Sequence, residues 1–99
     1  MNYYEVNCKD EFLDHTEGKE IFCALVNNVG LPIGYSEKQY SDFLNKIDFI
    51  YDSGYGSPEL DGFIWYKDGT WSERGEYDGS EWWEYKKFPE IPESLMNEK

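Results

Sequence analysis

The most regular hydrophobic pattern in the chain is helical and lies at residues 36–47. Four large apolar residues recur there at positions i, i+3, i+4 and i+7, the spacing of one helix face: Tyr40, Phe43, Leu44 and Ile47. Ser36 precedes them and Gln39 follows three residues later, which is the pattern of a capping box. We therefore expect an amphipathic helix that begins at Ser36 and packs this face on the core.

Residues 62–87 show the pattern of strands joined by tight turns. Three strand-like runs, 62–67, 70–77 and 80–87, are separated by Asp68-Gly69 and Asp78-Gly79. Asp-Gly pairs supply the positive φ angles that short hairpins need. In the middle run the residues alternate between two faces, with Trp71, Glu73, Gly75 and Tyr77 on one and Ser72, Arg74 and Glu76 on the other. The pattern predicts a three-stranded antiparallel meander with one face on the helix and the other in water.

Two further segments have strand character. Residues 3–8 alternate and predict a short first strand, which the charged residues 9–11 end. Residues 20–26 form a nearly continuous apolar run, which favours a buried central strand, although periodicity alone also allows a short helix. The fold class we expect is α+β: an antiparallel sheet of four to five strands ending in a three-stranded meander, with one amphipathic helix packed on it. Residues 1–93 would form a single acidic domain and residues 94–99 a frayed acidic tail.

The charge of the chain gives the first indication of its function. The 99 residues include 21 acidic and nine basic side chains, a net charge of −12, while 39% hydrophobic residues suffice for a core. Such a charge produces a negative potential that repels nucleic acid and attracts basic proteins. Aromatic residues cluster on the predicted meander, but single-strand binders also need a basic groove, so direct nucleic-acid binding is not expected. A solvated acidic surface that serves only solubility is the alternative.

The sequence offers little catalytic chemistry. His15 is the only histidine, and Cys8 and Cys23 lack the spacing of a metal or nucleophile site. The segment from Asp68 resembles a calcium loop only superficially, because Glu73 and Gly79 stand where that loop needs glycine and glutamate. We expect no enzyme, cofactor or metal. Without an apolar stretch of membrane length or a signal-peptide pattern, we expect a cytoplasmic protein with free thiols and no membrane partner.

The same meander suggests a partner-binding surface. Trp82 and Trp83 are adjacent and must face opposite sides of a strand, so at least one lies off the main core. An exposed Trp beside carboxylates suits a partner rich in Lys and Arg. The candidate partner-binding residues are Asp61, Asp68, Glu73, Glu76, Asp78, Glu81, Trp82, Trp83 and Glu84.

A resemblance of part of the meander to other proteins supports one of two hypotheses for the function. The runs Asp68-Gly69-Thr70-Trp71 and Glu76-Tyr77-Asp78-Gly79-Ser80-Glu81-Trp82-Trp83-Glu84-Tyr85-Lys86 are similar to segments of small acidic bacteriophage proteins. The resemblance covers a small part of the chain and assigns no residue a role. It implies an anti-defence inhibitor of the anti-CRISPR or anti-restriction type, which would act in the host cytoplasm and block a host nuclease or CRISPR effector by mimicking nucleic-acid charge. The alternative is a non-enzymatic protein-protein interaction module that uses an exposed aromatic patch or a sheet edge.

Overall fold

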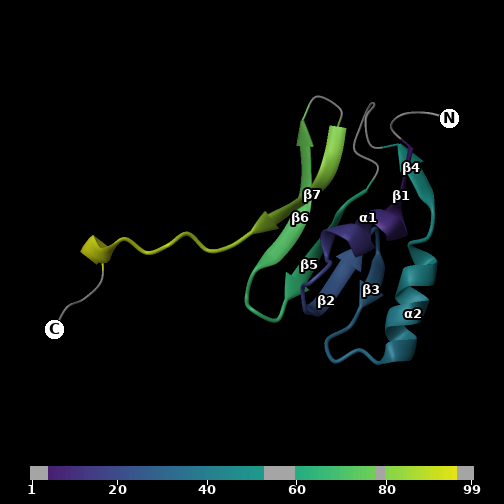
Figure 1. The fold of residues 1–99 in the computed structure, drawn as a ribbon, viewed down its shortest axis with the longest axis horizontal. Coiled ribbons are helices and arrows are strands. Elements are labelled where there is room, and N and C mark those ends of the chain that lie inside the picture. The colour runs from purple at the N-terminus through teal and green to yellow at the C-terminus, as the bar shows by residue number, and fades with distance from the viewer. Residues whose placement is uncertain (1–4, 53–59, 78–79, 96–99) are drawn as a thin grey trace.

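The computed structural model describes residues 5–52, 60–77 and 80–95 and has an α+β fold (Figure 1). A five-stranded antiparallel sheet has the order β3-β2-β5-β6-β7, and a separate two-stranded sheet pairs β1 with β4. The elements are β1 (Glu5–Asn7), α1 (Cys8–His15), β2 (Ile21–Val26), β3 (Val29–Leu31), α2 (Glu37–Lys46), β4 (Ile50–Asp52), β5 (Gly62–Tyr66), β6 (Trp71–Tyr77), β7 (Ser80–Lys86) and a short 3-10 turn, η1 (Glu93–Leu95).

The amphipathic helix is confirmed as α2. The Ser36 hydroxyl accepts a hydrogen bond from the Gln39 backbone N–H at 3.1 Å, and the Gln39 side chain accepts one from the Ser36 N–H at 2.8 Å. This capping box satisfies two N–H groups that a helix start leaves without partners. Phe43 and Ile47 are buried, while Tyr40 and Leu44 are partly buried against the core.

The meander is also confirmed, as β5, β6 and β7. Trp65 lies opposite Trp71 and Ser72 lies opposite Tyr85, as two successive antiparallel hairpins require. In the first turn only Gly69 has a positive φ, +92°, and the Asp68 carboxylate accepts a hydrogen bond from the Thr70 N–H at 2.9 Å. The second predicted turn, Asp78-Gly79, lies outside the described residues.

The expectation of one helix was wrong, because a second helix, α1, follows directly on β1. The first strand is shorter than the predicted 3–8 within the described residues: it ends at Asn7, and Cys8 begins the helix. The Asn7 side chain accepts a hydrogen bond from the Asp10 N–H at 2.9 Å and caps this helix. Only Cys8 and Phe12 are buried in α1, so its hydrophobic period was too sparse to be recognised.

Two short strands, β3 and β4, were not predicted either. β4 follows α2 and pairs with β1, so the N-terminal strand joins a separate small sheet and not the main one.

The central strand at residues 20–26 is confirmed as β2, and the helical alternative is excluded. Asn27 and Asn28 both have positive φ angles, 51° and 72°, and turn the chain tightly into β3.

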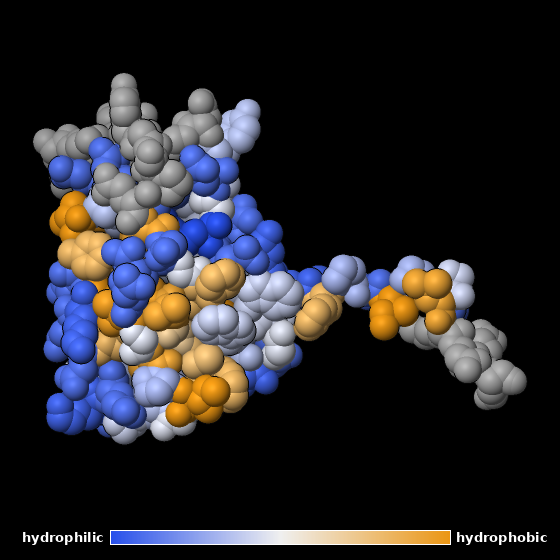
Figure 2. Space-filling view, turned by 180° about the vertical axis from the view of Figure 1, so that it is seen from behind, coloured by the Kyte–Doolittle hydropathy of each residue, from blue (hydrophilic) through white to orange (hydrophobic). Residues whose placement is uncertain are grey.

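The core lies on one face of the five-stranded sheet. α1 lies over this face and α2 lies beside β3 (Figure 1). The buried apolar residues come from both helices, from the strands and from positions next to these elements: Cys8, Phe12, Ile21, Ala24, Val26, Leu31, Phe43, Ile47, Tyr51, Leu60, Ile64, Tyr66 and Trp83. The opposite face of the sheet is seen from behind in Figure 2, where apolar side chains gather between hydrophilic borders.

Candidate partner-binding face

Alternate residues of four strands form the face of the sheet that points away from the helices. Across the strands, Leu25 lies opposite Phe63, Phe63 opposite Glu73, and Glu73 opposite Glu84. A neighbouring row runs from Trp65 through Trp71 to Lys86. We use the name outer face for Phe22, Leu25, Phe63, Trp65, Trp71, Glu73, Gly75, Trp82, Glu84 and Lys86.

The part of the outer face formed by β2 and β5 is apolar and exposed. Phe22, Leu25, Phe63 and Trp65 are 42%, 43%, 41% and 38% exposed. The rings of Phe63 and Trp65 stack with their centres 5.5 Å apart. Phe22 and Trp65 also line a hollow of about 440 Å³ that ends at the β5–β6 turn. Contiguous apolar surface of this kind is typical of a protein interaction site.

The part formed by β6 and β7 combines indoles with carboxylates. The Trp71 indole N–H donates to Glu73 at 2.9 Å, and the Trp82 indole N–H donates to Glu84 at 2.8 Å. Each pair joins residues i and i+2 of one strand, which share a face. Gly75 makes room for the second pair, because a Cβ there would lie only 2.5 Å from a Glu84 carboxylate oxygen and 2.8 Å from the Trp82 indole nitrogen.

Glu73 and Glu84 lie directly opposite each other on neighbouring strands. Like charges in this position repel and destabilise a sheet. Lys86 lies 3.2 Å from Glu84, and the hydrogen bond from Trp82, followed by this lysine, lowers the pKa of Glu84. Two carboxylates flanked by two indoles form a geometry that fits a Lys or Arg side chain, through ion pairing and cation–π contact together.

The structure divides the predicted site residues into several groups. Glu73, Trp82 and Glu84 come together on the outer face. Glu81 and Trp83 point into the protein and are 5% and 6% exposed, so neither presents a side chain to a partner. Asp61, Asp68 and Glu76 are exposed but are not among the residues of the outer face, and Asp78 lies outside the described residues.

The burial of Glu81 results from an internal ion pair. Arg74 Nη2 donates to the Glu81 carboxylate at 3.0 Å, and the Leu60 backbone N–H donates to the same oxygen at 3.1 Å. The Arg74 guanidinium also lies over the Trp83 ring, 4.9 Å from its centre. The alternation of β7 places Glu81 and Trp83 on one side and Trp82 and Glu84 on the other.

The sequence did not single out the apolar half of the outer face. Phe22 and Leu25 lie within the apolar run at residues 20–26, which was interpreted as a buried central strand. That interpretation fits a sheet covered by helices on both sides. Among the described residues both helices lie elsewhere, so these side chains remain exposed. A period-2 test of β5, where exposed Phe63 and Trp65 alternate with buried Ile64 and Tyr66, would have indicated this face.

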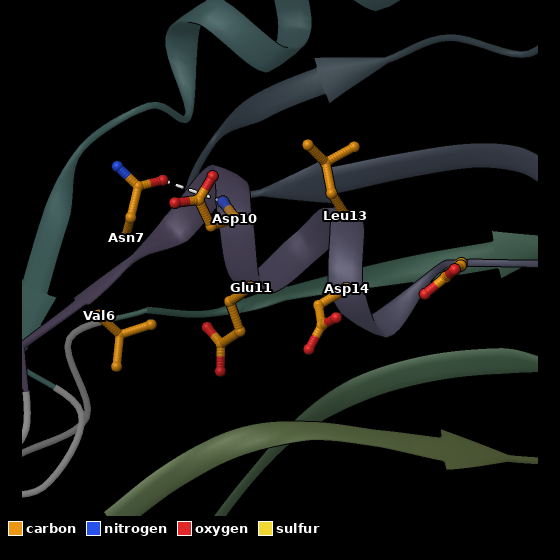
Figure 3. A pocket seen from close by; sticks show the side chains of 7 residues that line it. Val6, Asn7, Asp10, Glu11, Leu13 and Asp14 are labelled. Carbon is orange, nitrogen blue, oxygen red and sulfur yellow. Dashed lines mark hydrogen bonds between the residues drawn. The ribbon is translucent and has the colours of Figure 1, made fainter.

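A second feature is an acidic hollow along α1 (Figure 3). It has a volume of about 590 Å³ and is lined by Val6, Asn7, Asp10, Glu11, Leu13, Asp14 and Glu17. Glu11 and Asp14 extend from the same side of the helix (Figure 3). Asp10, Asp14 and Glu17 are exposed, and among the described residues their side chains make no ion pair. The four acids of this hollow, Asp10, Glu11, Asp14 and Glu17, are not among the partner-binding residues predicted from the sequence.

On the face of the sheet that the core covers, a polar cluster places the only histidine of the chain beside a serine. His15 Nε2 and Ser72 Oγ are 2.8 Å apart, and Ser72 Oγ and the Tyr66 hydroxyl are 2.7 Å apart. Burial, with smaller contributions from Arg74 and Lys19, lowers the pKa of His15. Ser72 is fully buried, so a substrate cannot reach its hydroxyl. This cluster therefore connects α1 to the sheet.

The cysteines are separate, free thiols. Cys8 is fully buried, and burial followed by the Glu11 charge raises its pKa to about 11. Cys23 is partly buried, and burial raises its pKa as well. Both thiols are therefore protonated at neutral pH. In the described part of the chain, His, Cys, Asp and Glu side chains form no group of three or more that would hold a metal ion.

Comparison with known proteins adds no relative: no family model matches the chain, and no curated protein or solved structure is significantly similar to it. None of the described helices is both long and apolar enough to span a membrane.

Proposed function

We propose that this protein is a non-enzymatic interaction module that binds a basic partner protein through its outer face. The observation that carries the proposal is the Glu73–Glu84 pair, placed directly opposite across β6 and β7 and bonded to the indoles of Trp71 and Trp82. A Lys or Arg side chain of the partner would lie between the carboxylates and relieve their repulsion.

The apolar half of the face would supply most of the affinity. Exposed ion pairs contribute only about 0–1 kcal/mol each. Phe22, Leu25, Phe63 and Trp65 together offer exposed apolar area, and aromatic anchors of this kind dominate many interfaces. The net charge of −12 would steer a basic partner toward the protein and accelerate association at low salt.

The test compares two variants that remove the same charge from different surfaces. Glu73→Gln/Glu84→Gln alters the outer face, and Asp14→Asn/Glu17→Gln alters the α1 hollow. Each tagged protein is used to capture partners from a lysate of the source cells at low salt, with quantitative mass spectrometry. We expect a specific partner to be lost about tenfold or more with the first variant and retained with the second. Equal recovery with both variants would contradict the proposal.

A second candidate function is supported by the acidic hollow. Asp10, Glu11 and Asp14 of α1 line it together with Glu17, which follows the helix. With the net charge of −12, this group of carboxylates favours an inhibitor that mimics nucleic-acid charge, the activity expected of a phage anti-defence protein directed at a host nuclease or CRISPR effector.

Competing DNA distinguishes the two candidates. A mimic occupies the groove that DNA occupies, so duplex DNA added to the lysate would displace its partner, and Asp14→Asn/Glu17→Gln would be the damaging variant. A partner bound on the outer face would tolerate DNA and depend on Glu73 and Glu84. Release by DNA together with insensitivity to the outer-face variant would therefore favour mimicry over the first proposal.

A further inference from the structure

The C-terminal segment of the described chain leaves the body of the protein as an arm. Residues 87–95, which we call the arm, are exposed throughout. Three of them are large apolar residues, Phe88, Ile91 and Leu95, which are 77%, 64% and 74% exposed. The arm extends far from the two sheets (Figure 1). Its extension raises the radius of gyration to 16.1 Å, whereas a compact chain of this length has about 13 Å.

The arm is built to remain extended. Pro89 and Pro92 fix their own φ angles and restrict the residues before them, Phe88 and Ile91, to extended backbone. The 3-10 turn η1 follows, closed by a hydrogen bond from the Leu95 N–H to the Pro92 carbonyl at 2.9 Å. At its base the Phe88 ring meets Trp71 edge-on at 5.4 Å, so the arm starts at the border of the outer face and leads away from it. Covering its own sheet would require a reversal that the two prolines oppose.

The arm and the outer face share apolar chemistry, because exposed apolar side chains dominate the arm and the β2–β5 part of the face. The arm also carries Glu90 and Glu93. Lys67, beside the hollow that Phe22 and Trp65 line, and Lys86, in the row with Trp65 and Trp71, would attract these carboxylates, whereas Glu73 and Glu84 would repel them. An extended arm of this length reaches up to about 30 Å. Five strands about 4.8 Å apart give a sheet about 20 Å wide, which one arm can cross.

We propose that two copies of the protein form an arm-exchanged dimer, in which the arm of each copy lies across the outer face of the other. A two-fold arrangement would use both arms and both faces at once, and would bury apolar side chains that the single chain leaves in water. The inference rests on the arm and its chemistry and does not require the basic partner. Since each copy carries a charge of −12, salt would screen their repulsion and strengthen the dimer.

The first experiment measures molar mass by sedimentation equilibrium over a concentration series in low and moderate salt. The test variant is Phe88→Ser/Ile91→Ser/Leu95→Ser, which changes only exposed residues and leaves the core intact. The matched control is Ile33→Ser, because Ile33 is 65% exposed and lies outside the arm and the outer face. We expect the unmodified protein and Ile33→Ser to dimerise and the arm variant to remain monomeric. A monomer throughout, or a dimer that the arm variant retains, would overturn the proposal.

A second experiment locates the arm. A spin label on Ile91→Cys, in a Cys23→Ser background, is mixed with ¹⁵N-labelled protein that carries the three serine substitutions in its own arm. Arm exchange predicts intermolecular broadening at the backbone amides of Phe63 and Trp65 and at the Trp65 indole N–H. Broadening confined to other surfaces, or none at concentrations where the unmodified protein dimerises, would exclude the outer face as the docking site. Near-UV circular dichroism of each variant confirms that the fold is retained.

Discussion

At the scale of single residues, burial decides what an ion pair contributes. Arg74 and Glu81 approach to 3.0 Å with side chains only 8% and 1% exposed, whereas Lys38 and Asp42 approach to 3.1 Å with side chains 83% and 52% exposed. The distances are nearly equal, but water screens only the second pair. Arg74 also donates to the Tyr51 hydroxyl at 2.8 Å and so holds β6 to β4. The two pairs therefore have different energetic consequences when one partner is removed.

We predict that Arg74→Met lowers the free energy of unfolding by about 3 kcal/mol, because the buried Glu81 carboxylate loses its cation. Adding Glu81→Gln should recover part of this loss by removing the uncompensated charge. The control, Lys38→Met, should cost no more than about 0.5 kcal/mol. Urea unfolding followed by Trp fluorescence measures all three. Equal losses for Arg74→Met and Lys38→Met would show that the internal network is unimportant for stability.

His15 makes stability depend on pH. Because burial lowers its pKa below the ordinary value of 6.5, the unfolded chain binds a proton at higher pH than the folded protein does. The contribution of His15 is therefore present above about pH 6.5 and is lost as the pH falls through that value. In urea titrations at about pH 7.5 and about pH 5.5, His15→Gln should lose less stability on acidification than the unmodified protein does. If both proteins lost the same unfolding free energy on acidification, the pH dependence would come from other titratable groups.

At the scale of elements, the join between β2 and β5 depends on one glycine. A Cβ at Gly62, which has a φ of +154°, would lie 2.4 Å from the Leu25 carbonyl oxygen and 3.2 Å from the Trp83 ring. The backbone carbonyl cannot move aside without breaking the pairing of Gly62 with Val26. From the sequence, Gly62 is expected only to begin a strand, because close backbone approach is visible only in the paired sheet.

We predict that Gly62→Ala lowers the free energy of unfolding by about 2 kcal/mol or more, through this clash and the strained φ. Gly30→Ala is the matched control, since nothing lies within 4 Å of the Cβ position of Gly30 in β3 and its φ is ordinary. Its effect should lie within about 0.5 kcal/mol. Thermal and urea unfolding compare the two. A comparable small change in both variants would show that β2 and β5 adjust to the added methyl group.

At the scale of the whole molecule, charge acts in opposite directions on the two proposed associations. Binding of a basic partner should weaken as NaCl screens the attraction, while the arm-exchanged dimer should strengthen as NaCl screens the repulsion between two acidic copies. Both associations use the outer face, so the arm of a second copy would compete with the partner. The serine variant of the arm should therefore bind the basic partner at least as tightly as the unmodified protein does.

Local sequence patterns predicted those elements that carry their own signals. The capping box of α2, its apolar face and the first Asp-Gly turn act within a few residues, so they are visible without tertiary context. Helix α1 and strands β3 and β4 were missed, because they are short and are stabilised by contacts distant in sequence, such as the hydrogen bond from the Cys8 N–H to the Phe49 carbonyl at 2.8 Å.

The sequence by itself determined an acidic chain with an α+β fold and a C-terminal meander in which Trp82 and Trp83 face opposite ways, because charge and strand alternation are properties of composition and order. Only the tertiary structure decided which side of that meander the helices cover. That choice buries Glu81 and Trp83 with Arg74, and it leaves Trp82 and Glu84 on the outer face beside Phe63 and Trp65. Alternation distinguishes two faces but cannot say which one is buried, since burial depends on how distant segments pack.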